Sequence, residues 1–139
     1  MSLVLDASAT IGWFMPGEQS RSLRELLDKV TISGATVPPL WKLEVGNALL
    51  FAERRQRVTP TQRSEALNQL ARLSISTDKD AAAHAWLSTF SLAQRFSLTL
   101  YDACYLELAQ RRGLPLASLD HDLRTAGSTL GIELLGLDE

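Results

Sequence analysis

Short apolar segments alternate with longer amphipathic segments along the whole chain, and this alternation restricts the fold more than any other feature. The apolar segments, which are predicted strands, are residues 3–5, 35–37, 73–76, 115–118 and 132–135. Predicted helices lie between them, at residues 7–14, 18–30, 40–55, 60–72, 81–96, 100–112 and 119–126. Strands that alternate with helices are typical of parallel βα units. We therefore expect an α/β fold, a three-layer α/β/α sandwich with a central parallel sheet of five strands.

The bulk properties of the chain indicate one globular domain. Its 139 residues show no linker, repeat or low-complexity segment, so we expect a single domain over residues 1–139. No apolar run approaches the roughly 20 residues that cross a bilayer, and we expect neither a membrane span nor a secretory signal. Cys104 is the only cysteine, which excludes an internal disulfide. A cytoplasmic location fits these features.

Four acidic residues lie where apolar segments begin or end. Asp6 and Asp120 follow predicted strands, whereas Glu44 and Asp102 lie in predicted helices. Open parallel sheets bind ligands at the carboxyl ends of their strands, which places Asp6 and Asp120 at that edge. Carboxylates held close together repel one another, and oxygen ligands suit a hard cation such as Mg²⁺ or Mn²⁺. These four residues are therefore our candidate metal ligands and catalytic residues.

Each carboxylate also has a plainer interpretation. Asp6 is in the position of a helix N-cap, Glu44 of a solvated surface residue, and Asp102 of an acid stabilised by the helix dipole. Helical periodicity favours function in two cases. Glu44 flanks an apolar helix face, with Asn47 as its neighbour three residues on, and Asp102 shares a stripe with Tyr105.

Weaker candidates surround these acids. Ser8 either orients a ligand or caps the first helix itself, and Asn47 is a candidate partner for Glu44. Asp122 is the alternative to Asp120, since one of the two caps the last helix while the other faces the site. We interpret His121 as a surface residue and His84 as structural.

The net charge of −2 does not exclude a nucleic-acid partner. Neutralising the four candidate ligands with metal would turn −2 into +2, and eleven of the fourteen basic residues are arginine. Arginine binds phosphate in a bidentate manner, so segments 54–57 and 111–112 are candidate backbone contacts. The alternative is that these arginines only complement the dipoles at helix C-termini.

The four acidic segments, taken in order, resemble the motifs of PIN-domain ribonucleases, and the chain as a whole resembles the VapC-type toxins of toxin–antitoxin pairs. The matching segments are Asp6-Ala7-Ser8, Glu44-Val45-Gly46-Asn47-Ala48-Leu49, Tyr101-Asp102-Ala103-Cys104-Tyr105-Leu106 and Ser118-Leu119-Asp120-His121-Asp122-Leu123. The resemblance covers nearly all of the chain. Ser118 stands where a threonine is more usual, and both side chains carry a hydroxyl.

This resemblance implies a PIN-like fold, Mg²⁺ or Mn²⁺ as cofactor, and cleavage of RNA phosphodiester bonds by metal-activated water. It also implies a homodimer and a small cognate VapB-type antitoxin as partner. One alternative is a PIN nuclease that processes or degrades RNA without an antitoxin.

Other classes of protein remain as alternatives. A phosphoacceptor receiver domain would need a lysine after a late strand, and the three lysines lie at positions 29, 42 and 79. A phosphohydrolase built on His121 and Asp122 would have too few imidazole ligands. A non-catalytic α/β interaction module would use the acids only as helix caps and would bind no Mn²⁺.

Overall fold

A five-stranded parallel sheet forms the centre of the protein in a computed structural model that describes residues 2–138. The strands, in the order β3-β2-β1-β4-β5, are β1 (Val4–Leu5), β2 (Ala35–Val37), β3 (Ile75–Thr77), β4 (Leu116–Ala117) and β5 (Leu134–Leu135). Every neighbouring pair is parallel. The predicted number and direction of the strands are thus confirmed.

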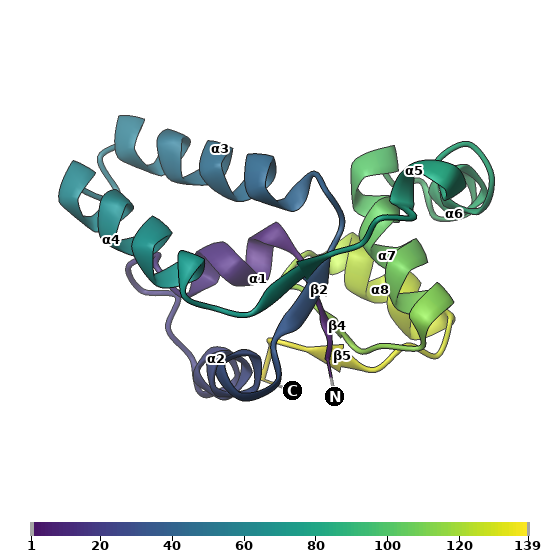
Figure 1. Cartoon of the computed structure of the whole chain (residues 1–139), viewed down its shortest axis with the longest axis horizontal. Helices are drawn as coiled ribbons and strands as arrows, with labels where there is room; N and C mark the ends of the chain where they lie inside the picture. Colours follow the sequence, from purple (N-terminus) through teal and green to yellow (C-terminus); the bar gives the residue numbers. More distant parts are fainter. Residues whose placement is uncertain (1, 139) are drawn as a thin grey trace.

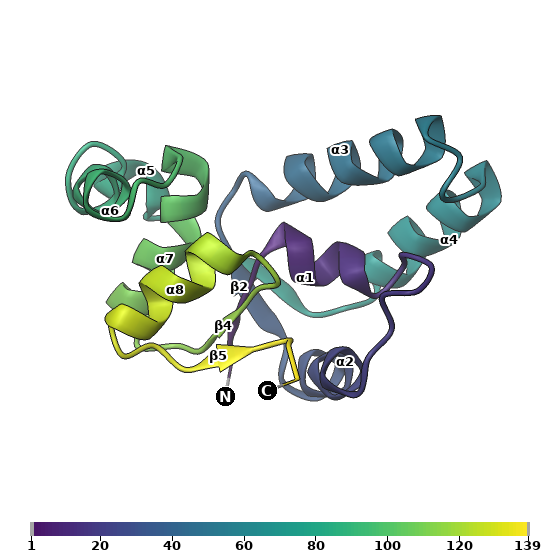
Figure 2. The ribbon, with the colours of Figure 1, turned by 180° about the vertical axis from the view of Figure 1, so that it is seen from behind.

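Helices cover both faces of this sheet. They are α1 (Ala7–Gly12), α2 (Arg21–Ser33), α3 (Trp41–Arg54), α4 (Pro60–Ala71), α5 (Ala81–His84), α6 (Ser88–Phe96), α7 (Leu100–Arg112) and α8 (His121–Thr129). The sheet separates α1 and α2 from α7 and α8, while α3 and α4 form a hairpin that extends on the side of α1 (Figures 1 and 2). None of the helices within residues 2–138 is long and apolar enough to cross a membrane.

The first strand lies in the middle of the sheet, and this position determines where a ligand can bind. From β1 the chain builds β2 and β3 on one side, then returns to build β4 and β5 on the other. Both β1 and β4 are fully buried. Ligands of such sheets bind where the strand order reverses, beyond the carboxyl ends of the central strands. Asp6 follows β1 directly, and Asp120 lies shortly after β4.

Several helix ends lie where the sequence predicts them. Thr59 and Gln62 form a capping box at α4, with Pro60 as the first helical residue. Helix α2 extends three residues beyond its predicted end at residue 30 and is ended by Gly34, which has a φ of 74°; a Cβ atom there would lie 2.6 Å from the carbonyl oxygen of Ser74. Only glycine fits this turn, which directs the chain from α2 into β2.

The single helix predicted over residues 81–96 is wrong, because the structure has two helices there, α5 and α6. Trp86 lies between the two helices and is 86% exposed, so the largest apolar side chain of this segment is not part of the core. The short α5 buries none of its side chains, whereas α6 buries Thr89 and Leu92 and packs against α7. Helices α5 and α6 therefore pack differently and do not share one continuous apolar face.

Candidate active site

Asp6 is a buried carboxylate with every oxygen engaged. Its Oδ1 atom accepts hydrogen bonds from the Ala9 amide at 2.9 Å and from the Ser8 hydroxyl at 2.7 Å. Its Oδ2 atom accepts one from the Ser118 hydroxyl at 2.5 Å. The residue is the N-cap of α1, yet its side chain is only 4% exposed. Asp6 is therefore both the N-cap of α1 and a member of a buried polar cluster.

The two serines tie this carboxylate to the segment that follows β4. The Leu119 amide donates to Ser8 Oγ at 2.9 Å, and the Asp120 amide donates to Ser118 Oγ at 3.0 Å. Ser8 therefore orients Asp6, and it is Asp6 that caps the helix. Through these bonds the chain after β1 and the chain after β4 are held at one edge of the sheet.

Glu44 is oriented by a residue on another helix. The Tyr105 hydroxyl on α7 donates to Glu44 Oε1 on α3 at 2.5 Å. Tyr105 is buried, and sequence reasoning placed it only on an apolar stripe. An apolar stripe does not need a hydroxyl group for packing, so the hydroxyl of Tyr105 is the signal that could have identified this residue as part of the site. Asn47, the expected partner of Glu44, is exposed and lines an open cavity with Glu44 and Tyr101.

Asp102 and Asp120 complete the arrangement from the first turns of α7 and α8. Asp102 is half-buried, and its amide donates to the Thr99 N-cap at 3.1 Å. Asp120 is the N-cap of α8 and accepts from the Asp122 amide at 3.1 Å. Asp120 is half-buried, whereas Asp122 is exposed. This difference favours Asp120 over Asp122 as the residue that faces the site.

The four carboxylates form a closed ring of electrostatic neighbours. Burial raises the pKa of Asp6, and the charge of Asp120 raises it further. Burial likewise raises the pKa of Glu44, with smaller effects from Asp102 and Asp6. The pKa of Asp102 is raised by burial and by the charges of Asp120 and Asp122. Asp6, Glu44 and Asp102 are thus each hindered in ionising both by burial and by at least one neighbouring acid of the ring, a pattern that is common at functional sites.

The donor atoms of this ring fit a hard divalent ion, because all of them are carboxylate oxygens. However, no three Asp, Glu, His or Cys side chains within residues 2–138 converge closely enough to enclose a metal ion. The four acids share an electrostatic field without forming a coordination shell. Mutual repulsion of like charges keeps such side chains apart, and a cation would remove that repulsion.

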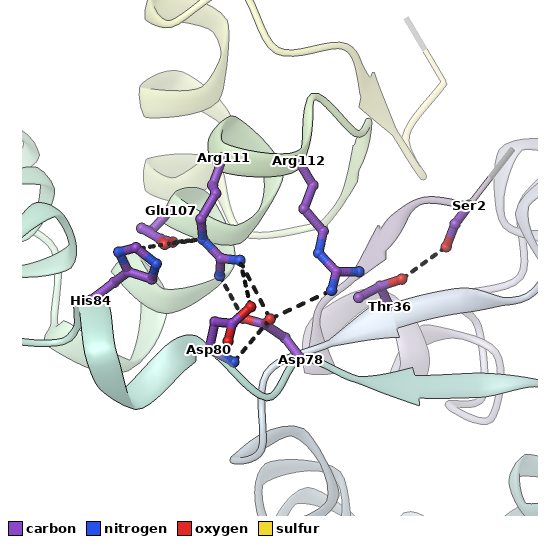
Figure 3. A network of polar contacts seen from close by, with 8 residues as sticks. All are labelled: Ser2, Thr36, Asp78, Asp80, His84, Glu107, Arg111 and Arg112. Carbon is purple, nitrogen blue, oxygen red and sulfur yellow. Dashed lines mark hydrogen bonds and ion pairs between the residues drawn. The ribbon is translucent and has the colours of Figure 1, made fainter.

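The arginines at the end of α7 have structural partners. Arg111 Nη2 lies 2.5 Å from Asp78 Oδ2, and its Nε lies 2.6 Å from Glu107 Oε1 (Figure 3). Arg112 lies 3.7 Å from Asp78, and His84 lies 3.9 Å from Glu107. Asp78 and Glu107 are buried, so this network holds α7 against the chain after β3. Arg111 is thus engaged within the fold, and His84 has the structural place that we expected.

Comparison with known proteins agrees with this arrangement. Residues 3–128 match the PIN domain family. Ribonuclease VapC3 of Pyrobaculum aerophilum is 29% identical over 123 residues, which cover 88% of this chain and 92% of that protein. The crystal structure of PAE2754 from the same organism superposes with a TM-score of 0.69 at 24% identity, over 96% of this chain and 83% of that one. A toxin–antitoxin complex from Klebsiella pneumoniae gives a TM-score of 0.55 at 18% identity, over 86% and 87% of the two chains. Because the family match spans most of the sequence, this protein belongs to the PIN-domain family.

Proposed function

We propose that this PIN-domain protein is a divalent-metal-dependent endoribonuclease of the VapC type, the toxin of a toxin–antitoxin pair. The observation that carries the proposal is the ring of four carboxylates where the strand order reverses. The family match and the similarity to a named ribonuclease support it.

In this proposal Asp6, Glu44, Asp102 and Asp120 hold Mg²⁺ or Mn²⁺. A bound divalent ion supplies Lewis acidity, which activates water for attack on a phosphodiester. The protein's own contribution is to position the ligands. Ser8 and Ser118 fix both oxygens of Asp6, and Tyr105 fixes Glu44 across the gap between α3 and α7. Asn47 and Asp122 lie at the margin of the site, where they would tune its geometry.

The proposed partners are an RNA substrate, a small VapB-type antitoxin and a second copy of the chain in a homodimer, all in the cytoplasm. The antitoxin is proposed because a structural neighbour is a toxin–antitoxin complex. The alternative, a PIN nuclease that works without an antitoxin, would use the same four carboxylates. The proposed chemistry of the site is therefore the same for the toxin and for this alternative.

Cleavage of total cellular RNA by the purified chain, freed of any bound partner, tests this function. We expect discrete fragments with 5′-phosphate and 3′-hydroxyl ends in Mg²⁺ or Mn²⁺ and none in chelator. Asp102→Asn should abolish cleavage, whereas Asp28→Asn, the same change at an exposed position on α2, should not. Metal-dependent cleavage by Asp102→Asn would overturn the assignment of the site.

A further inference from the structure

A cavity of about 460 Å³ lies between α1 and α3 beside the carboxylate ring. Its lining includes Ser8 and Ile11 from the α1 side, and Ala48 and Phe51 from α3. At one end, the Ser8 hydroxyl is bonded to Asp6. At the other end the lining includes Arg55 and Arg57, which follow α3. We call this cavity the α1–α3 groove, and it joins the acidic site to a basic end.

The end of α3 places both arginines at the groove. The Gln56 amide donates to the Glu53 carbonyl at 3.0 Å, and the Arg57 amide donates to the Ala52 carbonyl at 2.9 Å. These two bonds are those of a Schellman motif, in which Gln56 adopts a left-handed conformation with a φ of 61°. Because the turn is fixed by its backbone, Arg55 and Arg57 are held at the same cavity.

The groove is lined by two arginines and one glutamate, Glu18, so the net charge of its lining is positive and favours a nucleic-acid strand. A carboxylate ring repels phosphate until metal is bound, so attraction for RNA must come from outside the ring. Arg57 and Glu18 are 3.9 Å apart, and both side chains are nearly half exposed, so their pairing is weak and open to exchange. The Arg55 guanidinium lies 6.0 Å from the ring of Phe51, which is 44% exposed.

We propose that the α1–α3 groove binds the single-stranded RNA next to the bond that is cut, with Arg55 and Arg57 on backbone phosphates and Phe51 stacking on a base. Exposed aromatic rings combined with cationic side chains are the usual elements of single-strand binding. Glu44 and Arg55 are about 16 Å apart along the axis of α3, since a helix rises 1.5 Å per residue. The arginines therefore contact phosphates other than the scissile one. This inference rests on the proposed nuclease function and adds the path of its substrate.

Binding of a fluorescein-labelled single-stranded RNA of about 12 nucleotides tests the groove directly, measured by anisotropy over a range of salt. Asp102→Asn serves as the background, so that the RNA is not cut. Arg55→Gln with Arg57→Gln should weaken binding at least tenfold and lower the salt slope by about 1.4, or roughly 0.7 for each phosphate contact. Phe51→Ala should weaken binding at least fivefold with an unchanged slope, since one stacked base contributes about 1–3 kcal/mol.

Matched variants separate the groove from general charge effects. Arg21→Gln with Arg24→Gln removes the same charge from exposed positions on α2 and should leave affinity within twofold of the background protein. Glu18→Gln should tighten RNA binding, because it releases Arg57. Thermal unfolding of each variant verifies that it is folded.

Three results would overturn the groove as an RNA site. In the first, the Arg55 and Arg57 variant binds RNA as tightly as the α2 control. In the second, it loses affinity for the cognate antitoxin but keeps RNA binding, which makes the groove a protein-docking surface. In the third, it loses only self-association, which makes the groove an interface between copies. The nuclease function itself is tested by a separate experiment, RNA cleavage by the unmodified chain.

Discussion

Asp6 shows at the scale of one residue that a helix cap can also be a candidate metal ligand. Its Oδ1 atom satisfies the Ala9 amide at the start of α1, which is what any capping aspartate does. Its burial and its contact with Ser118 go beyond capping, because a cap needs no desolvation. Desolvation of a carboxylate costs stability, and such costs concentrate at functional sites.

Replacing one acid of the ring should stabilise the metal-free protein. The raised pKa values of Asp6, Glu44 and Asp102 mean that the folded state resists their ionisation. Stability therefore falls as pH rises from ordinary carboxyl values through the raised ones. We expect Asp102→Asn to raise Tm in chelator at pH 7 by roughly 3–5 °C, equivalent to about 1 kcal/mol. Asp28→Asn should leave Tm unchanged, and a lower Tm for Asp102→Asn would contradict the proposed repulsion.

Removing the Tyr105 hydroxyl should weaken metal binding. Tyr105→Phe deletes the hydrogen bond that orients Glu44, and hydrogen bonds to charged groups contribute about 1.5–3 kcal/mol. We expect Mn²⁺ affinity, measured by calorimetry, to fall at least tenfold. Tyr101→Phe, at the other and exposed tyrosine, provides the control. Equal affinities of the two variants would show that Tyr105 does not position Glu44.

Some residues of the site could be predicted from the sequence, and others could not. The acids were identifiable because each lies at the end of a strand or on the flank of a helix, where local pattern is informative. The hydrogen bond between Tyr105 and Glu44 joins residues 61 positions apart in the sequence, and local sequence pattern carries no information about contacts between such distant residues. Helical spacing places Tyr105 on the buried stripe of α7 but does not identify what its hydroxyl meets.

At the scale of elements, α7 connects the active site to a buried ionic network. Asp102 lies in its first turn, and Arg111 in its last turn binds Asp78 and Glu107. Burial opposes the ionisation of Asp78, but the hydrogen bonds from Arg111 and the Asp80 amide, together with the charges of Arg111 and Arg112, outweigh this effect, and the pKa of Asp78 is lowered. Arg111 therefore anchors the helix that positions Asp102 and Tyr105.

Breaking this network should destabilise the fold. Asp78→Asn leaves part of the Arg111 charge uncompensated, and we expect a loss of about 3 kcal/mol in urea unfolding at pH 7. Because the pKa of Asp78 is lowered by folding, its contribution is present above the ordinary carboxyl pKa and is lost as pH falls through the folded value. The difference between wild type and variant should therefore shrink below about pH 4.

A neighbouring residue supplies the control for this network. Asp80 lies 4.0 Å from Arg111 but is mostly exposed, so Asp80→Asn should cost less than about 0.5 kcal/mol. Similar losses for the two variants would show that burial of Asp78 is not what makes its ion pair important.

The turn after α3 offers a substitution with a predicted gain. Gln56 has a φ of 61°, a conformation that costs an L-residue about 1 kcal/mol and costs glycine little. Gln56→Gly should therefore raise the free energy of unfolding by about 0.5–1 kcal/mol. The same change at Gln69, inside α4, should lower it by about 1 kcal/mol. A loss of stability in both variants would contradict the Schellman geometry.

Elements with strong end signals were predictable, and those without were not. Thr59 with Pro60, and Gly113 after α7, mark boundaries that the structure confirms. Residues 85–87 contain no proline or glycine, so nothing local announces the break between α5 and α6. The break follows from tertiary packing, since α6 packs on α7 while α5 buries no side chain.

At the scale of the whole molecule, strand order is what brings the four acids together. They come from segments spread between positions 6 and 120 of the chain, and only the placement of β1 between β2 and β4 gathers them at one edge. The alternation of strands and helices predicts a parallel sheet, but periodicity does not fix the order of its strands. The resemblance to a known family predicts that the four acids belong to one site, and the structure supplies the strand order that gathers them.

Mn²⁺ binding to the purified chain is the measurement that tests the central claim most directly. Calorimetric titration should show saturable binding to the wild-type protein and to Asp28→Asn, and at least a tenfold weaker affinity in Asp102→Asn and in Glu44→Gln. Equal Mn²⁺ affinity in all four proteins, or no saturable binding to the wild type, would contradict the account and leave the four acids as helix caps and surface charges on a parallel α/β domain.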